Sequence, residues 1–424
     1  MGSEVSASRA WGALGLRDLR IFLGAYLGSF LARHVVQTAL QWHVTLLVAP
    51  DDRGLALGAF GLFRALPLLS LALPAGLLAD RVDRRRILLV AQLAVAALTL
   101  GLGLVTLSGG EPIGLLYAVS LLSAAALAFD LPARHALMAS LLPAEHVGHG
   151  ASLFGLTVEL AAIVGPALAG VGLATLDGDR SACGALYVGA SVVFVLVALL
   201  LRRIKPIAAP AVTAGAPALS MLDGLRFMWT EPRLRGAALI DLVAQFFGAA
   251  LSLLPLYATD ILHVGAVGYG WLVAAPALGG GLMGLWLAGT AERIEARGRV
   301  LVLAIVGYGL ATVVYGASTH FALTMLALAA AGAFDTLSTV LRIMLRTALT
   351  PDHLRGRATS ASMLFFVGGP QLGELETGLM TRWVGPVATV ISGGFLCLAG
   401  TAAVAFSHRP LLRWRREDPT DKPT

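Results

Sequence analysis

Residues 76–86, GLLADRVDRRR, form a short basic segment between two long apolar stretches at 55–79 and 87–107. Four arginines fall within this segment, too much charge for the interior of a bilayer. Each flanking stretch is at least as long as the roughly 20 apolar residues that a helix needs to cross the hydrocarbon core. The segment therefore predicts two membrane-spanning helices joined by a basic loop.

The composition extends this prediction to the whole chain. Of the 424 residues, 57% are hydrophobic and 13% are charged, and the mean hydropathy is +0.80. Soluble domains carry about 25% charged residues, so these values exclude a soluble globular enzyme as well as a disordered chain. The net charge of +6 fits basic cytoplasmic loops, and we expect no nucleic-acid partner. Cys183 and Cys397 lie in separate apolar runs and predict neither a disulfide nor a metal site.

Apolar runs separated by charged breaks predict twelve spans. They cover residues 21–47, 55–79, 87–107, 113–134, 150–176, 183–201, 236–259, 267–290, 300–318, 322–345, 358–383 and 387–406. Twenty-six Lys and Arg residues fall in the termini and the loops on their side, and only Arg53, Arg180 and Arg382 fall in the opposite loops. The positive-inside rule then predicts a multi-pass protein with both termini in the cytoplasm. The abundance of Ala, Leu, Gly and Arg over Lys favours a bacterial source, and so the bacterial inner membrane.

The longest segment between spans divides the chain into two halves. Residues 202–235 begin with an Ala/Pro-rich stretch and continue as SMLDGLRFMWTEPRLRG, which has apolar residues at helical spacing. We expect a flexible linker followed by an amphipathic helix on the inner leaflet. The predicted organisation is an N-terminal six-helix bundle at 1–201, this linker at 202–235, a C-terminal six-helix bundle at 236–406 and a basic cytoplasmic tail at 407–424.

The two halves resemble each other in sequence. Phe129-Asp130 matches Phe334-Asp335, and Gly165-Pro166-Ala-Leu matches Gly369-Pro370-Gln-Leu, at nearly the same offset along the chain. Each half contains an even number of spans, so the two copies are parallel repeats with the transport site between them near the midplane. The predicted fold class is an all-α polytopic membrane protein of twelve transmembrane helices in two parallel six-helix repeats.

The segment at 76–86 resembles the loop 2–3 signature of the major facilitator superfamily, Gly-x-x-x-Asp-Arg-x-Gly-Arg-Arg. The residues that fit it are Gly76, Asp80, Arg81, Arg84 and Arg85, while Asp83 stands at the second glycine. GPALAG at 165–170 is similar to the span 5 motif of proton-driven antiporters, although this motif is incomplete and ends in Ala169-Gly170.

Three further stretches are similar to the drug:proton antiporter branch of this superfamily, which includes the enterobactin exporters. They are FDLPARHALMASLLP, LRGAALIDLVAQFFGAALSLLPLYA and LRGRATSASMLFFVGGPQLGE. The resemblance covers essentially the whole chain, and it implies the major facilitator fold and an exporter that uses the proton gradient and no other cofactor.

The basic loop and its neighbours are candidates for a gate. Gly76 lets a neighbouring helix approach closely, and the Asp80 carboxylate can cap a helix or pair with an arginine of another span. The alternative is a loop that only sets the topology. Asp130, with Arg134, and the repeat-related Asp335 favour the same inner gate. The resemblance implies that Gly165, Pro166 and Gly170 make an interface helix that seals the inward-open cavity.

Charged and polar side chains within spans indicate the substrate cavity, because they are expensive in lipid. Arg33, Gln37 and Gln41 are four residues apart and predict one polar stripe on the first span. The other cavity candidates are His34, Arg64, Gln245, Glu374 and Glu376. His34 alone is as well explained by packing. Because residues of both signs are present, their charges do not distinguish an anionic from a cationic substrate.

Two acids are candidates for the proton carrier. Glu159 is the first choice, because a carboxyl group inside a membrane protein can load and release a proton. The alternative is a permanent ion pair with Arg33 or Arg64. Asp241 is the second choice, and its alternative is a helix cap or an ion pair with Arg235.

These residues favour a monomeric, proton-coupled antiporter that exports a siderophore or an amphipathic drug-like compound by alternating access. The alternative is a proton symporter or facilitator that imports a small metabolite, since one fold serves both directions. A membrane enzyme or scaffold is disfavoured, because the chain has no phosphate-binding GxxxxGK[ST] loop, no HExxH sequence and no paired cysteine ligands. The expected partners are a small-molecule substrate, protons and the lipid bilayer, and no metal is expected.

Overall fold

The computed structural model describes residues 15–142, 147–205, 219–248, 250–351 and 354–416, apart from the side chains at 72–73, 77, 80, 147–148, 219–222 and 355–367. Every regular element in these ranges is helical, which confirms the all-α class. The helices of the first half are α2 Arg17–Leu47, α3 Arg53–Arg81, α4 Arg84–Leu107, α5 Ile113–Ser140, α6 Val147–Thr175 and α7 Arg180–Leu201. Those of the second half are α8 Leu219–Thr230, α9 Pro232–Phe247, α10 Leu254–Leu256, α11 Gly265–Thr290, α12 Arg297–Ala317, α13 Phe321–Leu349, α14 Arg355–Ser407 and α15 Arg409–Leu412.

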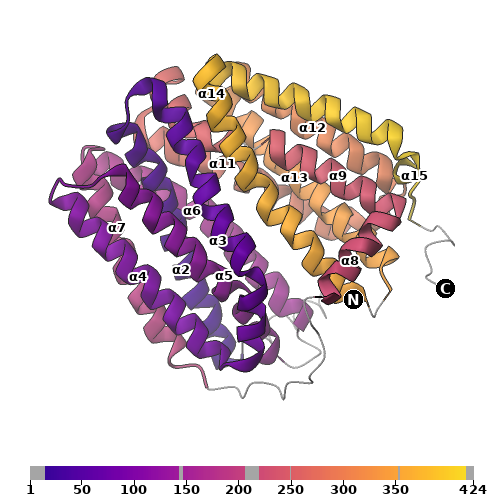
Figure 1. Cartoon of the computed structure of the whole chain (residues 1–424), viewed down its shortest axis with the longest axis horizontal. Coiled ribbons are helices and arrows are strands. Elements are labelled where there is room, and N and C mark those ends of the chain that lie inside the picture. Colours follow the sequence, from indigo (N-terminus) through magenta and orange to yellow (C-terminus); the bar gives the residue numbers. More distant parts are fainter. Residues whose placement is uncertain (1–14, 143–146, 206–218, 249, 352–353, 417–424) are drawn as a thin grey trace. The chain divides into compact units, whose positions relative to one another are not determined.

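The chain forms two compact units. Unit 1 contains Met1–Leu47 and Leu66–Ala214, and unit 2 contains Val48–Ala65 and Gly215–Thr424. Within unit 1, α2 packs against α6 and α7, and α4 packs against α5 and α7 (Figure 1). Within unit 2, α9 and α12 both pack against α14, and α13 packs against α11 and α12. Helix α3 is divided between the units, because its first half groups with unit 2.

Eleven helical segments in the described part of the chain are long and apolar enough to cross a membrane. The 53-residue helix α14 holds two of the predicted spans, because its backbone turns at Gly385, where φ is 81°, and Pro386 follows (Figure 1). Glycine adopts this left-handed conformation without steric cost, and proline then starts the next helix. Counting α14 as two spans confirms the twelve predicted from the sequence.

The seventh span is interrupted, although the sequence predicts one continuous helix at 236–259. Helix α9 ends at Phe247, and the chain continues through a 3₁₀ turn at Ala250–Leu253, the short α10 and a π-helical turn at Tyr257–Ile261. The Tyr308 hydroxyl donates a hydrogen bond to the Gly248 carbonyl at 3.0 Å. A side chain thus takes over a carbonyl at the break, a common cause of interrupted helices.

The two units repeat the same close helix contacts, as the sequence repeat predicts. In unit 1, a Cβ on Gly103 would lie 3.0 Å from the Gly184 carbonyl oxygen, and in unit 2 a Cβ on Gly394 would lie 3.0 Å from the Gly309 carbonyl oxygen. These contacts join α4 to α7 and α12 to the second half of α14. Gly103 faces Gly184 in the first contact and Gly309 faces Gly394 in the second, so the lack of side chains lets the helices approach closely.

The basic loop at 81–86 is held inside unit 1. Asp83 is the N-cap of α4, and its carboxylate accepts a hydrogen bond from the Arg85 backbone N–H at 2.9 Å. The Arg84 side chain donates to the Ala136 carbonyl of α5, and Arg85 donates to the Leu201 carbonyl at the end of α7, both at 3.1 Å. Cations at helix C-termini satisfy carbonyls and complement the helix dipole. The loop therefore ties three helix ends of one bundle together.

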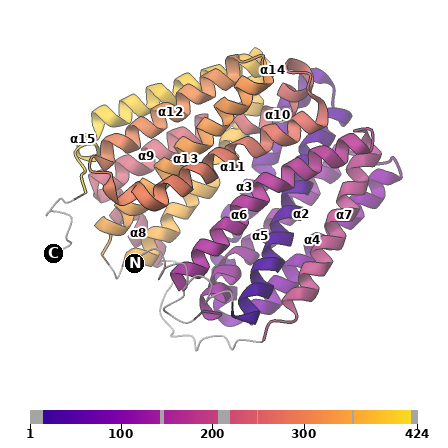
Figure 2. The same cartoon turned by 180° about the vertical axis from the view of Figure 1, so that it is seen from behind.

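The segment after α14 packs onto unit 2, where the sequence predicts only a basic tail. Trp414 is 1% exposed, and its carbonyl accepts a hydrogen bond from the Gly298 N–H at 3.1 Å. A Cβ on Gly298 would lie 1.8 Å from the Leu411 carbonyl oxygen, so glycine is required for this contact. Helix α15 consequently lies beside α9 and α12 (Figure 2).

Replacing Trp414 by alanine is expected to lower the free energy of unfolding by about 3 kcal/mol or more, because a fully buried tryptophan leaves a large cavity. Thermal unfolding of the purified protein in detergent measures this change. The control is Trp383→Ala, since Trp383 is 76% exposed and its loss leaves no cavity. Equal shifts in the two variants would show that the segment after α14 does not contribute to the fold.

Candidate transport site

A buried polar cluster lies inside unit 1. One oxygen of Asp130 accepts hydrogen bonds from the Tyr26 hydroxyl at 3.2 Å and from the Gln92 amide at 3.3 Å, and the other accepts from Arg134 Nε at 2.9 Å. Asp130 and Arg134 are one turn apart on α5 and are 1% and 3% exposed. A buried ion pair is tolerated when further hydrogen bonds satisfy its oxygens, as they do here.

Aromatic rings of α2 cover the Arg134 side chain. Its guanidinium carbon lies 4.8 Å from the centroid of the Tyr26 ring and 4.7 Å from that of Phe30. Tyr26 and Phe30 are four residues apart on α2 and therefore share one helix face. Their electron-rich faces stabilise the buried cation. The sequence did not identify these two residues, because aromatic residues at helical spacing are typical of an ordinary core.

Unit 2 carries a related cluster on α9 and α13. Gln245 donates a hydrogen bond to Asp335 at 3.3 Å, and Asp241 forms an ion pair with Arg342. Arg342 also donates to the Thr339 hydroxyl at 2.7 Å. The sequence left open an ion pair between Asp241 and Arg235. This alternative is wrong, because Arg235 donates a hydrogen bond to His408 instead.

The two clusters occupy equivalent places in the repeat. Asp130 corresponds to Asp335, and the match of Leu19-Arg20 with Leu234-Arg235 brings Tyr26 into register with Asp241. Unit 1 therefore has a tyrosine where unit 2 has a carboxylate. In both units an aspartate of the fourth repeat helix accepts a hydrogen bond from a side chain of the first repeat helix. The donor is Tyr26 of α2 in unit 1 and Gln245 of α9 in unit 2.

Arg64 and Glu374 form an ion pair within unit 2, between the first half of α3 and α14. Their side chains are 15% and 14% exposed. Next to the pair the two helices nearly touch, because a Cβ on Gly58 would lie 2.6 Å from the backbone of Gly378. Since each charge already has a partner in this conformation, neither is available to a substrate without breaking the pair.

Glu159 lies in the middle of α6 and is exposed. It is 12 residues from the start of the helix, or about 18 Å of rise. Phe154 and Gly165 of the same helix pack against α2, and a Cβ on Gly165 would lie 2.5 Å from the His34 Cβ. Six residues of an α-helix separate Glu159 from Gly165, so Glu159 points to another side.

Glu159 has no ion-pair or hydrogen-bond partner among the described residues. The permanent pair with Arg64 that the sequence left open is not formed, because Arg64 pairs with Glu374. Arg33 does not pair with it either among the described contacts, and Arg33 Nε is buried without a hydrogen-bond partner in the described part of the chain. Glu159 thus differs from Asp130, Asp241 and Glu374, whose carboxylates are paired with arginine.

The remaining predicted residues have different surroundings. Gln37 is exposed whereas Gln41 is buried, so the predicted polar stripe of α2 does not face one environment. A Cβ on Gly76 would meet nothing within 4 Å, and the close approach predicted there is not observed. The Asp80 side chain lies outside the described residues. Arg81 is exposed, Pro166 and Gly170 are buried in α6, and Glu376 is half-buried in α14.

A family model described as transmembrane secretion effector matches residues 10–422. The chain belongs to the transmembrane secretion effector family of the major facilitator superfamily. This membership confirms the resemblance seen in the loop at 76–86 and makes the chain a multi-pass membrane transporter rather than an enzyme. It also confirms the major facilitator fold of two six-helix repeats.

The relatives that this chain resembles in sequence include proteins named as exporters. The multidrug efflux pump Tap of Mycolicibacterium fortuitum is 27% identical over 96% of this chain and 98% of its own length. Tap of Mycobacterium tuberculosis H37Rv is 31% identical over 77% of this chain and 79% of its own. The enterobactin exporter EntS of Citrobacter koseri is 27% identical over 76% and 75%. These relatives support an exporter of the major facilitator superfamily.

Solved structures show the same fold at low sequence identity. A bacterial homologue of the human lysosomal transporter Spinster, in an inward-facing and unoccupied conformation, has a TM-score of 0.65 at 18% identity and covers 96% of this chain and 98% of its own. The nucleoside transporter NupG has a TM-score of 0.71 at 12% identity, with 94% and 100% covered. At these identities the likeness concerns the architecture alone.

Proposed function

We propose that this exporter is a proton-coupled antiporter of the bacterial inner membrane, with both termini in the cytoplasm, and that it works as a monomer. The observation that carries the proposal is Glu159, an exposed carboxyl group in mid-span without a partner among the described residues. A carboxylate in a membrane-spanning segment is costly unless it is paired or protonated. Among the described residues, Glu159 can therefore bind a proton without leaving an arginine unpaired.

The paired acids serve the structure of each bundle in this proposal. Asp130 and Asp241 have arginine partners within their own units, so protonation would leave Arg134 or Arg342 without a counter-ion. Removing one member of a buried pair is strongly unfavourable. Asp241 is for this reason a poorer candidate for the proton carrier than Glu159.

Alternating access then couples the two movements. Glu159 takes up a proton from the outside and releases it to the cytoplasm, and the substrate travels in the opposite direction during the return. An inward-moving proton gains about 2.3 kcal/mol per 100 mV of membrane potential, and the pH gradient adds to this. The antiporter-like motif of α6 places Gly165 six residues after Glu159, on the same helix.

The proposed substrate is a siderophore or an amphipathic drug-like compound. Arg33 supports an acceptor-rich substrate such as a catecholate, because its Nε–H is buried and unused among the described residues. Glu159 supports a cationic amphiphile. The names of the Tap and EntS relatives fit these two chemistries.

The test is substrate-driven proton movement in proteoliposomes with a pH-sensitive dye inside. A tris-catecholate siderophore and a lipophilic cationic dye serve as probes, each applied as an outward gradient without a pH gradient. We expect at least one of them to drive protons in the direction opposite to its own movement. Movement of substrate and protons in the same direction would contradict antiport and favour the importing symporter. Movement of substrate without protons would favour a facilitator.

A further inference from the structure

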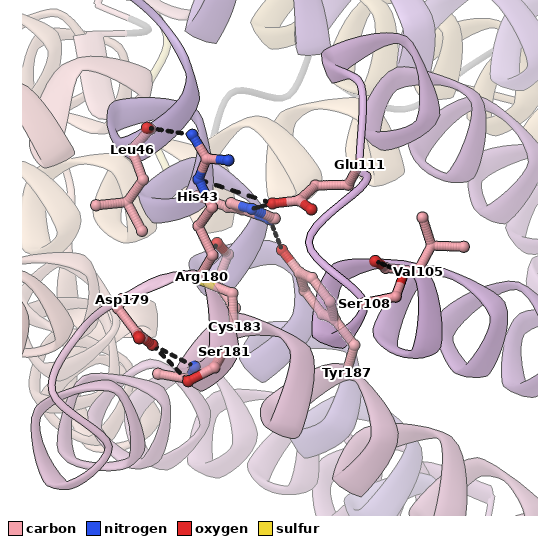
Figure 3. A network of polar contacts seen from close by, with 12 residues as sticks. His43, Leu46, Val105, Ser108, Glu111, Asp179, Arg180, Ser181, Cys183 and Tyr187 are labelled. Atoms are coloured by element: carbon pink, nitrogen blue, oxygen red, sulfur yellow. Dashed lines mark hydrogen bonds and ion pairs between the residues drawn. The ribbon is translucent and has the colours of Figure 1, made fainter.

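A second polar cluster lies in unit 1, at the end of the bundle opposite the loop at 81–86. It contains His43 near the end of α2, Glu111 between α4 and α5, and Tyr187 near the start of α7 (Figure 3). The His43 and Glu111 side chains are fully buried, and Tyr187 is 0% exposed. We call these three residues the His43 cluster. Neither the transport site nor the sequence motifs include them.

Both ring nitrogens of His43 are engaged. Nε2 lies 3.1 Å from Glu111 Oε1, and Nδ1 lies 3.2 Å from the Tyr187 hydroxyl. Figure 3 shows the imidazole placed between the carboxylate and the phenol. The second oxygen of Glu111, Oε2, is buried and has no hydrogen-bond partner among the described residues. A buried carboxylate with few donors is costly, so Glu111 favours a positive charge on its hydrogen-bond partner His43.

The arrangement can change its proton count by one without moving the backbone. With neutral His43, the Nε2–H donates to Glu111 and Nδ1 accepts from the Tyr187 hydroxyl. An added proton on Nδ1 makes an imidazolium that donates to both neighbours, and the Tyr187 hydroxyl turns to accept. The charge of Glu111 is then balanced by a direct partner, which a buried charge requires.

The other ionisable groups around the cluster do not take that proton. Arg180 Nε lies 3.8 Å from Glu111 Oε1, but its side chain is 50% exposed and it cannot accept a proton. Asp179 accepts hydrogen bonds from the Ser181 hydroxyl at 2.7 Å and the Ala182 N–H at 2.9 Å, and these lower its pKa. The Cys183 thiol faces the Ala39 carbonyl.

We propose that the His43 cluster is a proton-binding site on the side of unit 1 predicted to face outward, with one proton as its ligand. Its occupation ties the end of α2, the α4–α5 connection and the start of α7 more strongly together. The site stands apart from Glu159, because it lies toward the end of the spans and is closed to substrate by burial. The inference concerns proton binding itself and holds whether or not the chain is an antiporter.

The experiment is an NMR titration of the full-length protein in detergent micelles, with ¹⁵N-labelled histidines, from pH 5 to pH 8. The His43 signals are identified by their absence in His43→Gln. We expect these signals to change from those of a neutral ring to those of an imidazolium within this range. In Glu111→Gln the midpoint should fall by about one pH unit or more, because the carboxylate that stabilises the cation is gone.

The matched control is His263, an exposed histidine of unit 2 whose Nδ1 is bonded to the Thr259 carbonyl oxygen. Its signals should be the same in wild type and Glu111→Gln. A wild-type His43 that stays neutral down to pH 5 overturns the inference, as does an unchanged midpoint in a folded Glu111→Gln. If Glu111→Gln does not fold, the wild-type titration decides alone. Proton binding at His43 without substrate-driven proton movement in proteoliposomes would refute the antiporter and leave this site in place.

Discussion

Replacing Glu159 by glutamine is expected to abolish substrate-driven proton movement while leaving the protein folded. Glutamine has nearly the same shape but cannot exchange a proton, and Glu159 has no partner among the described residues that the change would leave unpaired. The ratio of protons moved to substrate moved should therefore fall to the level of liposomes without protein. The proteoliposome assay with a pH-sensitive dye measures the ratio directly.

The matched control for this experiment is Glu376→Gln. Glu376 is half-buried in α14, in the other unit, and its loss should leave the proton ratio close to that of wild type. Substrate exchange at equal concentrations on both sides should survive in Glu159→Gln, because exchange needs no net proton movement. A normal proton ratio in Glu159→Gln would assign coupling elsewhere, with Asp241 as the next candidate.

Replacing Asp130 by asparagine is expected to destabilise the protein by about 3–5 kcal/mol, because it leaves the buried Arg134 without a counter-ion. Asparagine can still accept the hydrogen bonds from Tyr26 and Gln92, so the loss reports mainly on the charge. This is a large part of the total stability of a typical domain. Thermal unfolding in detergent measures the change.

A double-mutant cycle separates the charge from the packing. Asp130→Asn combined with Arg134→Met removes both charges, and we expect the pair to be more stable than Asp130→Asn alone. The counterpart in unit 2 is Asp335→Asn, whose hydrogen-bond partner Gln245 is neutral. This substitution should cost about 1 kcal/mol. Equal losses for Asp130→Asn and Asp335→Asn would contradict the ion-pair explanation.

Much of the fold could be predicted from the sequence, because hydrophobic length and charge alone decide where a chain crosses a membrane. The match of Gly165-Pro166 with Gly369-Pro370 also predicted real structure. A Cβ on Gly165 would clash with α2, and one on Gly369 would lie 3.5 Å from the Gln245 Cβ on α9, so the matched glycines occupy equivalent helix crossings. Gly165 leaves no space for a side chain at its crossing, whereas at Gly369 a Cβ would make only ordinary van der Waals contact.

Partners across helices could not be predicted, because sequence spacing constrains contacts only within one helix. Asp241 pairs with Arg342, which lies 101 positions later in the chain, while the nearby Arg235 donates a hydrogen bond to His408. The role of Asp83 was hidden for a different reason. It departs from the superfamily signature, yet an aspartate is a favoured N-cap, and here it starts α4. The sequence did not identify His43, because it is one of nine histidines and belongs to none of the motifs.

The division of helix α3 between the units has a consequence for biosynthesis. Residues 48–65 leave the ribosome early, but Arg64 meets Glu374 only after another 310 residues have been made. At about 5–20 residues per second, this interval is roughly 15–60 s. Throughout it, Gly58 of α3, which lies against the Gly378 backbone in the folded chain, is without this partner helix. The start of the second helix therefore completes its packing only when the eleventh span has been made.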